Sequence, residues 1–414
     1  TRSGERLARS LSPSGKDGMA RADGQASAWP MRPPRSPAAR GVGLAVAQSV
    51  EGEEMEFVDA KGHTHVLERV DLPREWVQRF EPNSLRPVLG QSMSSGRFHV
   101  ALAAKPEMTV RLEILTCDNE QEHELRIVQL VAGLPHVANY LDHCFVEGKL
   151  YLVLECMGRR RMDDIFAELA EDKPLLEDGE PWKPLEVSLP ASEAAPEGVE
   201  PWFPLEAGLP LVLDVLRGVE GLDSRKVVHL DLSEPSSVSV RDRRAIIAGF
   251  EGMSCMIDGN PECRAWLEER IVGSAYRQAP EMRDGMPTGP ENHVWQVGLL
   301  LAKMTLAICP TDRLVLEHIP DAYSKMIDFS REGRERIHEV IRTHFSIREE
   351  PRFQALEQKA PDIARLLEGM LENDPSKRWT ARQASQELKA VMQSREMEVL
   401  PPLEPQRLPD EWFS

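Results

Sequence analysis

The stretch Val228-His229-Leu230-Asp231-Leu232, just past the middle of the 414-residue chain, decides the fold. Four further motifs follow it in order. They are Gly249-Phe250-Glu251, Ala279-Pro280-Glu281, His293-Val294-Trp295-Gln296-Val297-Gly298 and Asn373-Asp374-Pro375-Ser376-Lys377-Arg378. Each motif alone is a weak signal because short matches arise by chance, but five in one order point to one architecture.

Upstream of these motifs, short β-rich runs alternate with turns. Residues 97–103 and 108–115 predict paired strands with a turn at 104–107. A helix is expected at 119–131, where Leu125, Val128 and Leu130 form an apolar stripe. A hairpin is expected from strands 140–146 and 149–155, turning at Glu147-Gly148. Other expected helices are 72–80, 209–222, 291–307, 333–343, 361–372 and 380–393.

The order of these elements, together with the five motifs, resembles the eukaryotic protein-kinase fold across roughly residues 85–395. The resemblance implies an α+β, bilobal protein-kinase-like fold, with a small β-rich N-lobe carrying one main helix and a larger, mostly helical C-lobe. The expected order is a disordered basic tail (1–53), an N-terminal extension (54–84), the N-lobe (85–157), the C-lobe (158–395) and an extended C-terminal tail (396–414).

The resemblance also assigns the parts of a phosphoryl-transfer site, and most of them are altered. Asp231 matches the residue that accepts the substrate hydroxyl proton in kinases. Ser233 falls at the catalytic-loop lysine, Ser236 at the metal-binding asparagine and Gly249 at the metal-binding aspartate. Glycine offers no side-chain ligand and a neutral hydroxyl is a poor one, so no metal site is expected.

The nucleotide-binding parts are altered as well. Gly90, Ser92 and Gly96 form a vestigial glycine-rich loop with one glycine missing and one residue too many. Glu155 and Met157 fall at the hinge between the lobes. We therefore expect no cofactor.

The position of the phosphate-binding lysine has two candidates. Glu113 fits the local pattern Val110-Arg111-Leu112-Glu113 but lies only 11 residues before Glu124, which matches the glutamate of the main helix. Lys105 gives a more usual gap of 19 residues and stays an alternative. Structural roles are expected for Glu124 and His229, and for Glu281 and Arg378 as a buried ion pair.

Residues 171–208 form an acidic, proline-rich insertion with an internal repeat. Glu180-Pro-Trp-Lys-Pro-Leu-Glu186 recurs as Glu200-Pro-Trp-Phe-Pro-Leu-Glu206. Two copies are too few for a solenoid, so an extended, partly polyproline-like segment is expected. Trp182 and Trp202 either anchor a partner or pack on their own domain.

Composition excludes several classes of protein. The chain has 50 Lys and Arg against 68 Asp and Glu, a formal net charge of -18, which argues against a general nucleic-acid binder. No apolar run approaches the roughly 20 residues of a membrane helix, so no transmembrane segment is expected. The sequence holds no secretory signal, although a signal already removed would leave the same sequence.

The six cysteines form no Cys-x-x-Cys pair or zinc-finger spacing, so no structural metal is expected. Cys144 and Cys156 are expected to be buried thiols, because their neighbours are apolar. Cys255 and Cys263 flank a short turn and could form a disulfide in an oxidising compartment, which stays open.

Among kinase relatives, Gly249-Phe250-Glu251, the acidic body and the basic N-terminal segment most resemble the apicomplexan rhoptry-kinase (ROP) family, especially its divergent branch that includes the bradyzoite pseudokinase. That resemblance implies secretion into a parasitophorous vacuole or cyst and a host or vacuolar protein partner. The expected function is a catalytically inactive pseudokinase that acts as a protein-interaction or scaffold module. Two alternatives remain: a weak or atypical kinase that uses Asp231, and a structural component of a secreted matrix.

Overall fold

The computed structural model describes residues 55–58, 64–67, 78–80, 86–87, 97–115, 118–146, 148–156, 160–162, 205–233, 237–250, 253–255, 273–282, 289–306, 308–320, 322, 330–405 and 407. The chain divides into two units, Thr1–Val46 and Ala47–Ser414, and every described residue belongs to the second. Several expectations lie outside the described residues. They concern the basic tail, the glycine-rich loop, Met157, Ser236, Glu251, Cys263 and nearly all of the 171–208 insertion.

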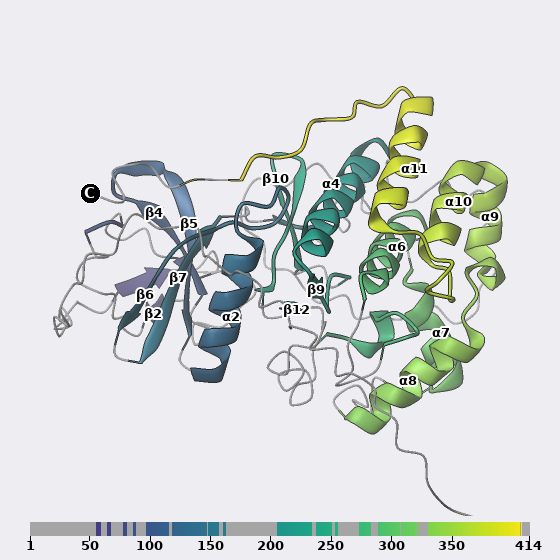
Figure 1. Ribbon diagram of the computed structural model, residues 1–414, viewed down its shortest axis with the longest axis horizontal. Coiled ribbons are helices and arrows are strands. Elements are labelled where there is room, and N and C mark those ends of the chain that lie inside the picture. Colours follow the sequence, from purple (N-terminus) through teal and green to yellow (C-terminus); the bar gives the residue numbers. More distant parts are fainter. Residues whose placement is uncertain are drawn as a thin grey trace, which may run out of the picture. The chain divides into compact units, whose positions relative to one another are not determined.

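A five-stranded antiparallel sheet forms the N-lobe, in the strand order β3-β4-β5-β7-β6 (Figure 1). The strands are β3 (Arg86–Pro87), β4 (Arg97–Leu102), β5 (Lys105–Leu115), β6 (Tyr140–Val146) and β7 (Lys149–Glu155). The hairpin of β6 and β7 has the predicted bounds, and Gly148 supplies the positive φ of 75° that its turn requires.

Strand β7 shows why this sheet forms, because its side chains alternate between two apolar clusters. Leu150, Leu152 and Leu154 pack into the large core on the side of helix α2 (Asp118–Val131). Tyr151 and Val153 point to the opposite face and join a smaller cluster with the residues of β4. Both faces of the sheet centre are therefore covered.

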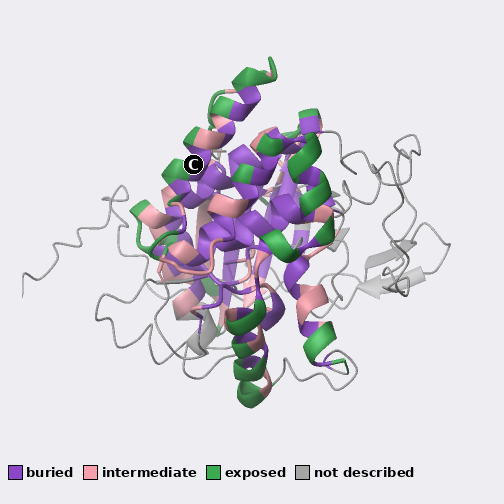
Figure 2. Cartoon of the chain, turned by 90° about the vertical axis from the view of Figure 1, so that its right-hand side faces the viewer, coloured by how far each residue is buried: buried purple, intermediate pink, exposed green. Residues whose placement is uncertain are grey.

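Helices make up most of the C-lobe. They are α4 (Leu205–Ser224), α6 (Glu291–Leu306), α7 (Pro310–His318), α8 (Arg331–His344), α9 (Pro351–Lys359), α10 (Pro361–Met370) and α11 (Ala381–Ser394). Helices α4 and α6 are buried nearly all round, whereas the peripheral helices turn polar faces outward (Figure 2). Proline begins α7, α9 and α10, and Thr380 with Gln383 forms a capping box at the start of α11.

Short strands connect the lobes near the first motif. Strand β9 (Val227–His229) pairs with β12 (Met253–Cys255), and β10 (Val238–Arg241) pairs with both β11 (Arg244–Ile247) and β8 (Arg160–Arg161). A separate antiparallel pair is formed by β1 (Met55–Val58) and β2 (Thr64–Leu67). Together with the sheet and the helices, these strands confirm the predicted bilobal α+β architecture.

Several predicted boundaries are wrong. The turn expected at 104–107 lies at Ala103-Ala104, because Lys105 already pairs with Leu102. The extra residues 106–108 belong to β5, where the register shifts. The insertion expected to end at 208 ends before Leu205, where α4 begins. The helix expected at 72–80 does not reach its end, since Phe80 forms an isolated bridge with Leu102.

Other expectations need smaller changes. Helices α7 and α9 were not predicted, and each has only nine residues. Cys144 and Cys156 are half-buried rather than buried, because they lie toward the outer edge of the sheet and at the end of β7. Within the part of the chain that the structure describes, no helix has the length and apolar character needed to cross a bilayer.

Candidate functional site: the catalytic loop and the nucleotide cleft

The loop after β9 is held by a fully buried histidine. The Nε2 of His229 lies 2.7 Å from the carbonyl oxygen of Ala248, and its Nδ1 accepts from the backbone N–H of Asp231 at 3.2 Å. Burial lowers the pKa of His229 to about 4, so the ring is neutral near pH 7. A neutral ring with the proton on Nε2 satisfies both contacts. His229 therefore joins the loop to the segment that carries Gly249.

Helix α6 holds the same loop in place with two polar side chains, those of His293 and Gln296. The backbone N–H of His229 donates to Nε2 of His293 at 2.7 Å, and Nδ1 of His293 lies 2.8 Å from Oδ1 of Asp223. Gln296 accepts from the N–H of Ser233 at 3.0 Å and donates to the carbonyl of His229 at 3.3 Å. Two side chains of α6 thus fix the backbone of the loop, and Asp223 of α4 orients one of them.

Asp231 is half-buried at the tip of this loop, and its Oδ1 accepts from the N–H of Ser274 at 3.3 Å. The preceding Gly273 has a φ of +68°, and a Cβ there would lie 2.5 Å from the carbonyl oxygen of Leu230. Glycine is therefore required for the two segments to approach this closely. The approach positions a carboxylate that could accept a proton from a hydroxyl group.

The position assigned to the metal-binding aspartate has no side chain. Gly249 has a φ of +74°, and an added Cβ would lie 3.2 Å from Oγ of Ser237 and 3.6 Å from Nε2 of His229. Ser233, at the lysine position, is buried, and its amide bonds to Gln296. Among the described residues, no group of three or more His, Cys, Asp or Glu side chains could hold a metal ion.

Glu113 lies near the middle of the sheet, and it forms an ion pair with Arg111 on the same face of β5. Both side chains are buried, with exposures of 0% for Glu113 and 7% for Arg111. In the register, Glu113 is paired with Leu152 of β7. Lys105 is exposed at the hairpin end of β5, opposite Leu102. Of the two candidates, Glu113 is therefore the one inside the sheet.

The predicted hinge residue Glu155 is used to join the lobes. It is 2% exposed; its Oε2 accepts from the N–H of Asn139 at 3.1 Å, and its Oε1 lies 2.8 Å from Nη2 of Arg241. Arg241 also donates to the carbonyl of Cys156 at 2.8 Å. This side chain is thus committed to the contact between β7 and β10. Glu124 is buried on α2, with an exposure of 5%.

The ion pair expected between Glu281 and Arg378 is present. Nη1 and Nη2 of Arg378 donate to Oε1 and Oε2 of Glu281 at 2.6 and 3.0 Å. The arginine side chain has no exposed surface, but 26% of the glutamate side chain is exposed, so only one end of the pair is fully buried. The guanidinium also lies 5.0 Å from the ring centre of Trp295.

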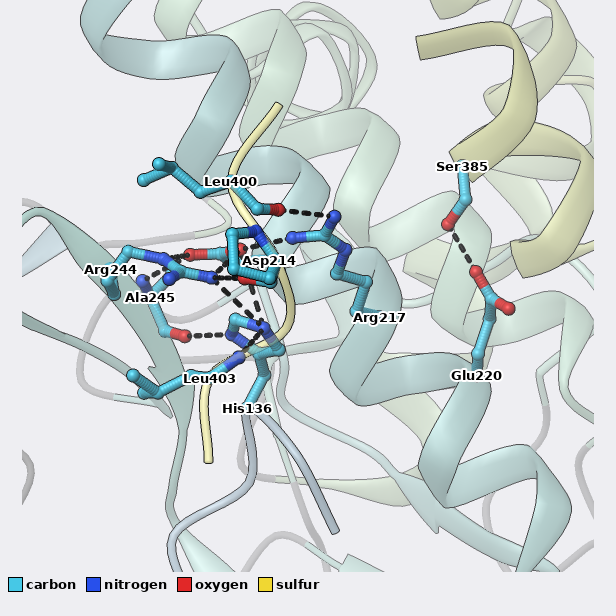
Figure 3. Close-up of polar contacts among 10 residues, drawn as sticks. His136, Asp214, Arg217, Glu220, Arg244, Ala245, Ser385, Leu400 and Leu403 are labelled. Carbon is cyan, nitrogen blue, oxygen red and sulfur yellow. Dashed lines mark hydrogen bonds and ion pairs between the residues drawn. The ribbon is translucent and has the colours of Figure 1, made fainter. Parts of the chain in front are cut away.

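A second polar cluster, which was not predicted from the sequence, joins α4 to β11 (Figure 3). Asp214 is 2% exposed and accepts from Arg217 at 3.2 Å and from Arg244 at 2.8 and 3.1 Å. His136, also 2% exposed, lies 3.5 Å from the same carboxylate. The signal that could have revealed this cluster is a single carboxylate in the apolar run of α4.

Comparison with known proteins agrees with this geometry. The sequence matches the protein kinase domain family over residues 104–388. Its relatives include serine/threonine-protein kinase PAK 4 of Homo sapiens, 24% identical over 169 residues, which are 41% of this chain and 24% of that protein. Mitogen-activated protein kinase kinase kinase 17 of Arabidopsis thaliana is 25% identical over 170 residues, 41% of this chain and 39% of that protein.

A third relative extends the match. Serine/threonine-protein kinase CST20 of Candida albicans is 21% identical over 231 residues, 54% of this chain and 16% of that protein. The match thus spans between about a sixth and two fifths of the length of these three relatives. The family match covers well over half of this chain and includes the loop after β9, both partners of the Glu281–Arg378 ion pair and strands β6 and β7 of the sheet. The chain therefore belongs to the protein kinase domain family.

Proposed function

We propose that this kinase domain does not transfer phosphate and that it acts by binding other proteins. The observation that carries the proposal is the buried pair of Arg111 and Glu113 on β5. A kinase needs a cation on this strand to attract the phosphates of the nucleotide. Here the strand carries a carboxylate whose charge is balanced by its neighbour, so the pair offers phosphate no net positive charge.

The other altered positions also argue against phosphate transfer. Phosphoryl transfer depends on metal ions that offset the charge of the transferring group. Gly249 has no side chain to bind one, and Ser233 places a buried hydroxyl where the resemblance expects a lysine. Metal stabilisation is worth several kcal/mol, and each ~1.4 kcal/mol is a factor of ten in rate. Loss of both groups should lower the rate by several orders of magnitude.

The relatives named as kinases and the ordered Asp231 argue for testing activity directly. The assay is transfer of radiolabelled phosphate from ATP with and without Mg²⁺, for the wild-type chain and for Asp231→Ala. We expect equal background for both proteins. Transfer that requires Mg²⁺ and disappears in Asp231→Ala would refute the proposal.

Nucleotide binding is tested separately by thermal unfolding with ATP or ADP, with and without Mg²⁺. Because a ligand that binds the native state stabilises it, we expect an unchanged unfolding temperature. As a matched control, Glu113→Gln removes the carboxylate and leaves Arg111 in place. A nucleotide-dependent rise of several degrees in the wild-type protein would contradict the proposal.

The site of action is part of the same proposal and rests on the resemblance to the rhoptry-kinase family alone. We propose on this basis that the protein acts in a parasitophorous vacuole or cyst, with a host or vacuolar protein as partner. Antibody labelling of the intact vacuole tests this. Staining confined to the cytoplasm of the producing cell would contradict it.

A further inference from the structure

The polar cluster around Asp214 does more than stabilise α4, because it holds a segment of the C-terminal tail. After α11 ends at Ser394, the chain continues in extended form past α4 toward the N-lobe side (Figure 1). Residues 400–403 cross the cluster. The tail thus spans the junction between elements of both lobes.

The side chains of the cluster form hydrogen bonds with backbone atoms of the tail. Arg217 donates to the carbonyl of Leu400 at 2.7 Å, and Arg244 donates to the carbonyl of Pro401 at 2.6 Å (Figure 3). The N–H of Leu403 donates to Nε2 of His136 at 2.9 Å. Two consecutive carbonyls and one amide are therefore recognised by three side chains from three separate segments.

The three recognising side chains are also held by contacts that do not involve the tail. Asp214 holds both guanidinium groups, and its Oδ2 also accepts from the N–H of Ala245 at 3.2 Å. Nδ1 of His136 lies 3.0 Å from the carbonyl oxygen of Ala245, which leaves Nε2 free to accept. Preorganised donors and acceptors of this kind lower the entropy cost of binding a peptide.

The side chains of the tail follow the pattern of a bound extended peptide. Met397, Val399 and Leu403 pack against the main core, whereas Glu398, Pro401, Pro402 and Glu404 are exposed or nearly so. Proline suits an extended backbone whose carbonyls are free to accept. The segment thus combines apolar anchors with backbone contacts, as peptides recognised in extended form commonly do.

We infer that the polar cluster of His136, Asp214, Arg217 and Arg244 is a peptide-binding site, which the tail occupies in this structure. Its ligand is an extended segment with a proline-containing centre, an apolar residue on each side and a free N–H at the position of Leu403. A partner protein with such a segment would bind here by displacing the tail. This inference rests on the proposed function, because it names the site at which the domain would bind a partner protein.

The sequence itself contains related segments. Pro402-Leu403-Glu404 in the tail repeats as Pro184-Leu185-Glu186 and Pro204-Leu205-Glu206. In the second repeat, Leu205 is already the first residue of α4 and is buried, so that copy is committed to the helix. The occurrence of the same tripeptide elsewhere shows which partner sequences to test first.

The test measures binding of a fluorescein-labelled peptide of residues 397–407 to the full chain by anisotropy. In the Leu403→Asp variant, a charge replaces an apolar anchor and weakens the tail's own binding. We expect saturable binding to this variant and at least ten-fold weaker binding to wild type, whose site is occupied by its own tail. Leu403→Pro removes the N–H that donates to His136 and shortens the apolar side chain without adding a charge, and it serves if the first variant does not fold.

Three controls define the recognition. A peptide with N-methylated Leu403 and a peptide of scrambled sequence should each bind at least ten-fold more weakly. Adding Arg217→Gln to Leu403→Asp should have the same effect. Absence of saturable binding to both Leu403 variants, or equal binding of the scrambled peptide, would overturn the inference. Because the assay involves no nucleotide, phosphate transfer by the domain would leave this result unaffected, and the two proposals can fail independently.

Discussion

Replacement of Glu281 by glutamine tests how the Ala279-Pro280-Glu281 motif and the last motif of the C-lobe stabilise each other. Arg378 has no exposed side-chain surface and donates to both carboxylate oxygens of Glu281. It also donates to the carbonyls of Glu372 at 2.8 Å and Glu291 at 3.0 Å. The substitution removes the negative charge, keeps one acceptor oxygen and leaves a buried guanidinium without its counter-ion.

The size of the effect follows from these contacts. Removing one partner of a fully buried ion pair costs roughly 3–5 kcal/mol. Here the glutamate is partly hydrated and the guanidinium keeps its bonds to carbonyls, so Glu281→Gln should lower the free energy of unfolding by about 2 kcal/mol. Arg378→Met should cost more, about 4 kcal/mol, because it also leaves buried carbonyls without a donor.

Urea unfolding monitored by tryptophan fluorescence measures both variants. Glu387→Gln is the matched control, because Glu387 pairs with Arg365 at 3.1 Å on the surface and should change stability by less than about 0.5 kcal/mol. If Glu281→Gln cost no more than this control, or more than Arg378→Met, the assignment of the buried charge to Arg378 would be wrong.

Three further predictions use other parts of the fold. Gly273→Ala should lower the free energy of unfolding by about 2–3 kcal/mol in urea titrations, because the new Cβ meets a backbone carbonyl at a φ of +68°. Burial lowers the pKa of His136 below 6.5, so the folded state binds fewer protons at this ring than the unfolded state does. The stability that the neutral ring contributes is therefore complete above pH 6.5 and is lost as the pH falls through the lowered pKa. His136→Gln should therefore show a smaller loss of stability than wild type between pH 7.5 and 5, and an equal loss would exclude the role of this ring. Glu113→Leu alone should cost about 3–5 kcal/mol, whereas Arg111→Leu with Glu113→Leu should be nearly neutral, and equal unfolding midpoints for the single and double variants would contradict the burial of the pair.

Elements encoded by local patterns could be predicted from the sequence. The hairpin of β6 and β7 follows from alternating apolar residues around a glycine turn, and its bounds are confirmed. Helix α11 has a capping box at Thr380, and the predicted start was one residue early. The strands β9 to β12 could not be predicted, since three or four residues carry no period and their partners lie elsewhere in the chain.

The candidate site could be predicted only in part, because its geometry also depends on contacts between distant parts of the chain. The choice between Lys105 and Glu113 could not be made by counting residues, because the irregular pairing beside Leu102 changes the spacing in the hairpin. Arg111 was missed because its role depends on which face of β5 is buried. The polar cluster that contacts the tail joins residues more than 100 positions apart, from His136 to Arg244, so only the folded chain brings them together.

The pairing of Arg111 with Glu113 on one strand face limits how this domain can change over evolutionary time. Exchanging Glu113 for lysine would put two cations next to each other in a buried place, and exchanging Arg111 first would strand the carboxylate. Each single substitution is thus unfavourable, whereas the two substitutions together are not. The two positions are therefore coupled, so that a lysine at position 113 would be tolerated only together with a substitution of Arg111.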